Sequence, residues 1–126
     1  MNDLIPKNKF DIDFIKRLRG SDINKIWPIV PALLEWLQDA NWPVAEFIIE
    51  YFSPYVNDIK KDIITILRSE DEMWKYWVML CLIFNFPGHL DNDILTAVRH
   101  LRDNSTNLEK EAGVDELAEE ILEKFE

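Results

Sequence analysis

The chain of 126 residues is 48% hydrophobic and 30% charged, which is typical of one folded domain over residues 1–126 and excludes a disordered chain. Its 24 acidic residues outnumber 14 basic ones, and the net charge of −10 argues against a nucleic-acid partner, because phosphate contacts need a basic face. It contains three glycines, fewer than the turns of a sheet or barrel need, so an all-α fold is expected.

Apolar residues recur with the 3.6-residue spacing of an α-helix through nearly the whole chain. Pro43 is expected at the first position of its helix, where the amide lacks an intrahelical acceptor in any case. Residues 104–112 are expected to be a polar loop. Side-chain caps are expected at the starts of three helices, from Asp11, from Ser21 or Asp22, and from Asp91 or Asn92. The expected helices cover residues 11–20, 21–27, 28–38, 43–52, 55–68, 73–84, 91–103 and 114–125.

The segment MWKYWVMLCLIF, residues 73–84, is apolar on most sides and is expected to be the most enclosed helix. Trp74 and Trp77 lie on its main stripe and are expected in the core, with Met73 on a second apolar stripe. Cys81 is expected to be an inert buried thiol. Because it is the single cysteine, it excludes an internal disulfide and favours a reducing cytoplasm.

An internal repeat underlies the helical pattern. The motif Leu33-Leu34-x-x-Leu37 recurs as Ile63-Ile64-x-x-Leu67 and as Ile94-Leu95-x-x-Val98, at spacings of 30 and 31 residues. Trp42 and Trp74 open the second helices of the first two units. Three helix pairs of this period predict a short α-α superhelix (a HEAT/ARM-like solenoid), with an N-terminal capping helix.

Three motifs carry a resemblance to a known family: LIPKNK at residues 4–9, LLEWLQDANWPVA at residues 33–45 and WKYW at residues 74–77. They resemble a small bacterial family classed as a domain of unknown function, and the resemblance spans almost the whole chain. The resemblance implies a HEAT-like helical domain from a bacterial cytoplasm. It implies no activity.

Residues suited to catalysis or metal binding are few. His89 and His100 lack the spacing of metal ligands, and residues 91–93 lack the glycine and closing glutamate of a calcium loop. The carboxylate pair Glu46 and Glu50 lies on a face expected to be wet, which would not separate their pKa values. We therefore expect a protein that is not an enzyme and that uses no metal and no cofactor.

The sequence also bears on location. The longest apolar run, residues 77–84, is far shorter than the ~20 residues that a membrane span needs. The first ten residues lack an apolar core after a basic start, so no secretory signal is expected. The expected location is the cytoplasm, with no membrane partner.

Tryptophan supplies the best indication of a binding surface. Trp36 lies on the flank of its helix, and Trp42 lies at a helix entry, so each either packs on a neighbouring helix or is a partly exposed anchor. If exposed, the two flank Asp39 and Asn41 in an aromatic and polar patch that suits protein recognition. The equivalent corner of the second unit would extend the candidate patch, which comprises Trp36, Asp39, Asn41, Trp42, Glu72 and Lys75.

Several functions remain open at this point. The leading hypothesis is a non-catalytic protein-interaction module that acts as a monomer or weak dimer. A narrower version is an immunity or inhibitor protein that neutralises a basic toxin, since residues 103–126 carry a net charge of −7. The alternative class is a small ligand-binding protein or enzyme with a pocket near Trp36, Trp42 and Trp74. A HEAT-like reader of DNA lesions is disfavoured by the net charge of the chain.

Overall fold

The computed structural model describes residues 4–126, and the regular secondary structure of these residues is helical throughout, which confirms the expected all-α class. Short 3₁₀ turns at Trp27–Ile29, Glu35–Gln38 and Ser53–Tyr55 extend or connect the α-helices, and a π-helical turn covers Met79–Ile83. The α-helices are α1 (Phe14–Arg19), α2 (Ile23–Ile26), α3 (Val30–Leu34), α4 (Pro43–Phe52), α5 (Lys60–Leu67), α6 (Glu72–Val78), α7 (Asn92–Asp103), α8 (Asn107–Glu111) and α9 (Val114–Phe125).

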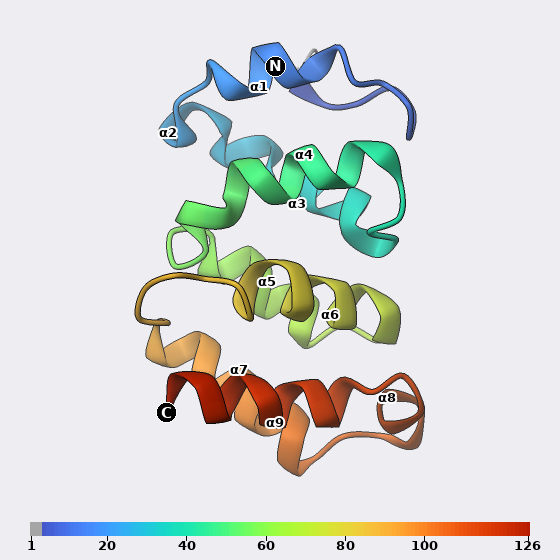
Figure 1. Ribbon diagram of the computed structural model, residues 1–126, viewed down its shortest axis with the longest axis vertical. Coiled ribbons are helices and arrows are strands. Elements are labelled where there is room, and N and C mark those ends of the chain that lie inside the picture. The colour runs from blue at the N-terminus through green and yellow to red at the C-terminus, as the bar shows by residue number, and fades with distance from the viewer. Residues whose placement is uncertain (1–3) are drawn as a thin grey trace.

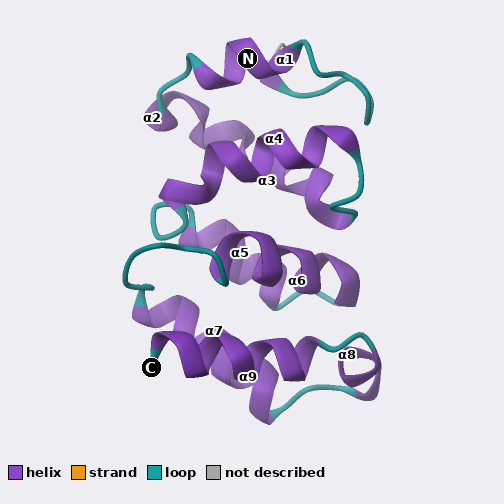
Figure 2. Ribbon diagram, viewed as in Figure 1, coloured by secondary structure: helices purple, strands orange, loops and turns teal. Residues whose placement is uncertain are grey.

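The helices lie in successive layers along the longest axis of the molecule, from α1 at one end to α7 and α9 at the other (Figure 1). Helix α4 packs on the 3₁₀ turn that follows α3, α6 packs on α5, and α9 packs on α7. Neighbouring layers meet where α6 contacts the 3₁₀ turn after α3 and where α7 contacts α5. Loops and turns connect the layers along their sides (Figure 2).

The repeated apolar motif forms the interior of these layers. Leu33, Leu34 and Leu37 are fully buried. The same positions in the later layers are also buried, except for Ile64, which is partly exposed. Each layer therefore hides the same edge of its first helix against its neighbours. This burial accounts for the recurrence of the motif, because a helix of about two turns is marginal without tertiary packing.

Polar contacts between layers recur at nearly the same sequence separation. Arg19 pairs with Glu50, 31 residues on, and the Tyr51 hydroxyl donates to the carbonyl oxygen of Ser21, 30 residues back. Asn57 donates through its amide to the carbonyl oxygen of His89, 32 residues on, at 2.8 Å. Further contacts of this kind are the pairs Lys60–Asp91, Lys60–Asp93 and Lys75–Glu109, at separations of 31, 33 and 34 residues, and the 2.8 Å hydrogen bond from the Asp91 amide to Asn57 Oδ1, 34 residues back.

Local cap chemistry sets several helix starts. The carboxylate of Asp22 accepts a hydrogen bond from the amide of Asn24, and that of Asp91 accepts one from the amide of Asp93, both at 2.8 Å, which confirms two expected caps. The expected cap at Asp11 is wrong. Its carboxylate accepts from the amide of Lys7 instead, and α1 begins later, at Phe14.

Residues 104–112 are not the polar loop that we expected. They contain α8, which begins with a capping box: the Thr106 hydroxyl accepts from the amide of Glu109 at 3.1 Å, and the Glu109 carboxylate accepts from the amide of Thr106 at 2.8 Å. Gly113 follows with φ +82°, a left-handed conformation that allows the sharp turn into α9.

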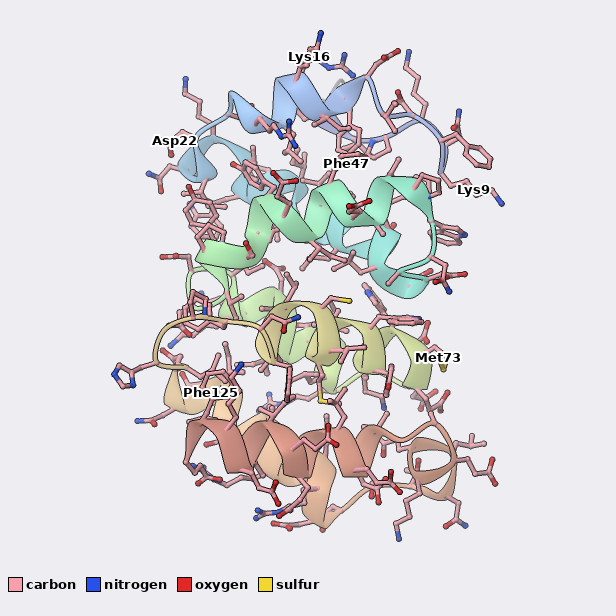
Figure 3. The ribbon with its side chains drawn as sticks, in the orientation of Figure 1. Lys9, Lys16, Asp22, Phe47, Met73 and Phe125 are labelled. Atoms are coloured by element: carbon pink, nitrogen blue, oxygen red, sulfur yellow. The ribbon has the colours of Figure 1, made fainter. Side chains whose placement is uncertain are left out.

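The segment 73–84 is less enclosed than expected. Met73 is 45% exposed, and it lies at the outer edge of the molecule (Figure 3). Trp74, Trp77 and Cys81 are partly buried rather than central. The helix widens into a π turn, marked by a 2.8 Å hydrogen bond from the Phe84 amide to the Met79 carbonyl oxygen.

Candidate functional site

The corner between α3 and α4 brings Trp36 and Trp42 into contact. Trp36 lies in the 3₁₀ turn after α3, and Trp42 is the N-cap residue of α4 with an extended backbone, ψ 135°. Their ring centroids are 5.6 Å apart with an interplanar angle of 70°. Both rings are partly buried against the core, so each keeps part of its surface exposed. An edge-to-face pair of this kind restrains the orientation of both rings.

Asp39 and Asn41 hold the shape of this corner. The Asp39 carboxylate accepts a 2.9 Å hydrogen bond from the amide of Asn41, and its carbonyl oxygen accepts one from the amide of Trp42 at 3.2 Å. One carboxylate oxygen of Asp39 therefore stabilises the turn through this hydrogen bond, as in an Asx turn. Of the predicted patch, the structure thus brings together Trp36, Asp39, Asn41 and Trp42.

The two tryptophans also line a shallow hollow of about 320 Å³. We call it the tryptophan groove, and its lining consists of Ile5, Ala32, Glu35, Trp36, Gln38 and Trp42. The sequence analysis missed four of these residues, although Ala32, Glu35 and Trp36 share one helical stretch with a recognisable i, i+3, i+4 spacing. Glu35 is the charged residue in the lining.

Trp74 is not part of the lining of the tryptophan groove. Its indole Nε1 donates a 2.9 Å hydrogen bond to the carbonyl oxygen of Leu34, and its ring packs against the core. It therefore joins the first layer to the second. The tryptophan groove is therefore lined by Trp36 and Trp42 without Trp74.

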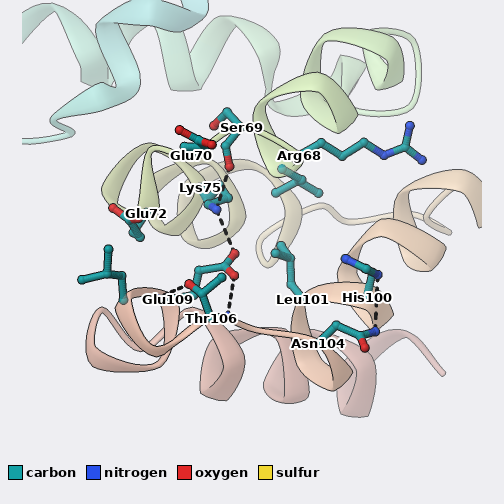
Figure 4. Close-up of a pocket in the computed structure, with 12 residues that line it drawn as sticks. Arg68, Ser69, Glu70, Glu72, Lys75, His100, Leu101, Asn104, Thr106 and Glu109 are labelled. Carbon is teal, nitrogen blue, oxygen red and sulfur yellow. Dashed lines mark hydrogen bonds and ion pairs between the residues drawn. The ribbon is translucent and has the colours of Figure 1, made fainter.

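Glu72 and Lys75 belong to a different hollow, of about 540 Å³, bounded by the turn after α5, by α6, by the end of α7 and by α8 (Figure 4). We call it the corner pocket. The prediction that Lys75 extends an exposed patch needs correction, because the residue is 4% exposed. Its Nζ donates at 2.8 Å to the carbonyl oxygen of Ser69 and at 2.8 Å to Glu109 Oε2.

Glu109 is the partner that permits a charged lysine in the interior. Burial raises the pKa of its carboxyl group, but the hydrogen bonds from Lys75 and from the amide of Thr106 outweigh that effect and hold the pKa below its usual value. The sequence analysis missed Glu109. Its signal was the spacing Thr106-x-x-Glu109, a capping box, which fixes α8 but does not reveal the lysine.

The rest of the corner pocket combines an apolar wall with a polar rim. Leu67 and Leu101 are buried, whereas Leu108 is 61% exposed at the edge. Glu70 and Glu72 lie on the same side as Lys75, while His100 lies on the opposite side with Asn104, and their side chains approach to 3.4 Å (Figure 4).

The described part of the chain also bears on metal binding, thiol reactivity and membrane insertion. Residues 4–126 contain no group of three or more histidine, cysteine, aspartate or glutamate side chains that could hold a metal ion. Cys81 is partly buried, and burial raises the pKa of its thiol, which disfavours the reactive thiolate. Among the described helices, none has both the length and the apolar character to cross a membrane.

The described residues form an all-helical domain whose hollows include one lined by two tryptophans and one built around a buried ion pair. The chain belongs to the family described as domain of unknown function (DUF5071), which matches residues 4–122. A comparison with curated proteins finds no match to the chain.

Proposed function

We propose that this chain is a non-catalytic protein-interaction module, built as a short HEAT-like solenoid, that binds a basic segment of another protein. The solenoid is supported by the apolar motif that is buried in each layer and by the ties between layers at separations of 30 to 34 residues. Solenoids of this kind bind partners along a surface that the stacked units share. The resemblance of its motifs favours a bacterial cytoplasm, and we propose a monomer or weak dimer.

The single observation that carries the proposal is the edge-to-face pair of Trp36 and Trp42 on the tryptophan groove. Tryptophan side chains dominate the energetics of protein interfaces, since each buries a large area at a small cost in side-chain entropy. Here both rings are fixed by packing and yet keep part of their surface exposed. A partner would therefore meet a surface that needs little rearrangement.

The charge of the chain supports a basic partner. Glu35, exposed in the lining of the tryptophan groove, gives that groove a negative group, and the whole chain carries a net charge of −10. Such a field speeds the approach of a basic protein and slows that of an acidic one. The preferred segment would place an aromatic or aliphatic side chain against the two tryptophans and a lysine or arginine near Glu35.

The test is selection from a displayed library of random peptides on the immobilised protein. We expect enriched sequences that combine a large apolar residue with lysine or arginine. A selected peptide, measured by fluorescence anisotropy, should bind Glu35→Lys and Trp42→Ala at least about tenfold more weakly than the original chain.

Two matched variants control this experiment. Glu46→Lys makes the same charge change on the exposed face of α4, and Trp27→Ala removes a tryptophan that is 38% exposed at a distant turn. Neither should change the affinity of the peptide by more than about twofold. Enrichment without basic residues, or equal binding by a folded Trp42→Ala, would contradict the proposal. Circular dichroism of each variant reports whether it is folded.

A second candidate, an inhibitor of a basic toxin, rests on α9. Glu116, Glu120 and Glu123 are exposed on this helix, and within the described residues none of the three has a basic partner. If this face binds, reversing all three charges should abolish binding of the selected peptide and its dependence on salt. Loss with Glu35→Lys but not with the α9 variant favours the first candidate.

A further inference from the structure

The corner pocket holds a buried hydrogen-bond donor that lacks an acceptor. A lysine ammonium group has three N–H donors. Lys75 directs two of them to the Ser69 carbonyl oxygen and to Glu109, and no other residue between 4 and 126 accepts the third. Because Lys75 lines the corner pocket, an acceptor that entered this hollow could satisfy the third N–H. A ligand carbonyl there would gain more than it gains at a wet surface.

The charges around the corner pocket determine which kind of ligand group can supply that acceptor. Lys75 and Glu109 neutralise each other at 2.8 Å, which leaves Glu70 and Glu72 as the charges on the same side (Figure 4). The guanidinium group of Arg68 extends away from that side (Figure 4). A carboxylate ligand would therefore meet the repulsion of neighbouring carboxylates, whereas a neutral carbonyl would not.

The apolar part of the lining favours a ligand with a hydrocarbon portion. Leu67 and Leu101 form a buried wall, and Leu108 leaves 61% of its surface exposed at the edge of the hollow. The volume of about 540 Å³ lies in the range of sites that enclose a small ligand or a few side chains. The aliphatic stem of a lysine or arginine matches such a wall, because its charged head can remain at the rim.

We propose that the corner pocket is a second docking site for the basic segment of the partner. In it, a backbone carbonyl accepts from the free N–H of Lys75, an aliphatic stem lies on Leu101 and Leu108, and a lysine or arginine head meets Glu70 and Glu72. This inference rests on the proposed function for the existence of a basic partner. It adds a second position on the molecule, the backbone contact to Lys75, and a second charged contact at Glu70 and Glu72.

The probes are two short capped peptides that differ in one charge, acetyl-Leu-Arg-Leu-amide and acetyl-Leu-Glu-Leu-amide. Each is titrated into the ¹⁵N-labelled chain at low salt, and backbone amide shifts are followed by NMR. We expect the arginine peptide to shift the amides of Ser69, Lys75, Leu101 and Glu109 in a saturable way. The glutamate peptide should bind at least about fivefold more weakly.

Two sets of variants test the named contacts. Glu70→Gln with Glu72→Gln removes the rim charges and should weaken binding of the arginine peptide about fivefold or more. The control, Glu46→Gln with Asp58→Asn, makes the same change in net charge at exposed residues of α4 and of the turn before α5 and should leave the affinity unchanged. The double variant Lys75→Met with Glu109→Gln removes the donor without leaving a lone buried charge. It should abolish the saturable shifts, and a cooperative unfolding transition in urea would show that this variant is still folded.

The outcomes separate this inference from the proposed function. Shifts confined to Ala32, Trp36 and Trp42 would overturn the corner pocket and leave the tryptophan groove in place. Shifts at the corner pocket that persist in Trp42→Ala support the inference even if the tryptophan groove fails its own test. Equal binding of both peptides, an unchanged affinity in the rim variant, or the absence of saturable shifts would overturn it.

Discussion

The indole Nε1 of Trp74 donates a 2.9 Å hydrogen bond to the backbone carbonyl oxygen of Leu34, forty residues earlier in the chain. The bond joins the first turn of α6 to the last residue of α3, so it ties the second layer to the first. Trp74, in the first turn of α6, thus contacts the layer before its own. This contact accounts for the place of the Trp74 ring outside the lining of the tryptophan groove.

The change Trp74→Phe tests this tie. Phenylalanine keeps most of the apolar ring but has no donor, so we expect a loss of about 1–2 kcal/mol in the free energy of unfolding. Urea denaturation should show a lower midpoint with an unchanged slope. The control is Trp27→Phe, whose exposed indole makes a 3.4 Å bond to Asn24, and which should cost less than about 0.5 kcal/mol. Equal losses in the two variants would contradict the tie.

The buried pair Lys75–Glu109 should respond strongly to the loss of one partner. Lys75→Met leaves Glu109 unpaired in the interior, and we expect a cost of about 3–5 kcal/mol, whereas the double variant Lys75→Met with Glu109→Gln should recover much of it. A double-mutant cycle from urea denaturation measures the coupling.

The matched control for this cycle is the pair Arg19–Glu50, in which both side chains are more than half exposed. Its coupling should stay below about 1 kcal/mol, because solvent screens the two charges. A coupling between Lys75 and Glu109 as small as that of Arg19 and Glu50 would show that the buried pair adds nothing beyond a surface contact.

Acid should weaken the fold through Glu109. Its pKa is lowered in the folded chain, since the hydrogen bonds from Lys75 and Thr106 outweigh the effect of burial. A lowered folded pKa gives stability that is present above the unfolded value of about 4.3 and is lost as the pH falls through the folded value. The difference in urea midpoint between the original chain and Glu109→Gln should therefore shrink below about pH 4. A difference that is constant from pH 6 to pH 3 would refute this origin.

The fold follows from the sequence where the signals are local. The motif around Leu33 and Leu34 repeats because each layer buries the same helix edge, and apolar spacing shows this directly. The cap at Asp91 and the start of α4 at Pro43 are likewise set by residues within one turn of the helix. Such features need no knowledge of distant parts of the chain.

The candidate site is harder to predict, because its key contacts join distant residues. The sequence around Lys75 predicts an exposed helix residue, because its buried partner Glu109 lies 34 residues further along the chain. The lining of the tryptophan groove includes Ile5, which is distant from Trp42 in the sequence and comes near it only in the folded chain. Helix α8 escapes prediction for another reason: the spacing Thr106-x-x-Glu109 is that of a capping box, but the polar composition of residues 104–112 favours a loop.

The capping box of α8 supplies a last test. Thr106→Ala removes the hydroxyl that accepts from the Glu109 amide, so we expect a loss of about 1 kcal/mol and faster hydrogen exchange across residues 107–111. Thr106→Ser keeps an acceptor and should recover most of the loss. The control is Thr96→Ala in α7, where the hydroxyl donates back to the carbonyl oxygen of Asn92 on an exposed face, and alanine should be neutral or slightly stabilising. If both alanine variants destabilise equally, the Thr106 hydroxyl is not what orders α8, and the hydrogen bonds from Lys75 and from the Thr106 amide to the Glu109 carboxylate must order it.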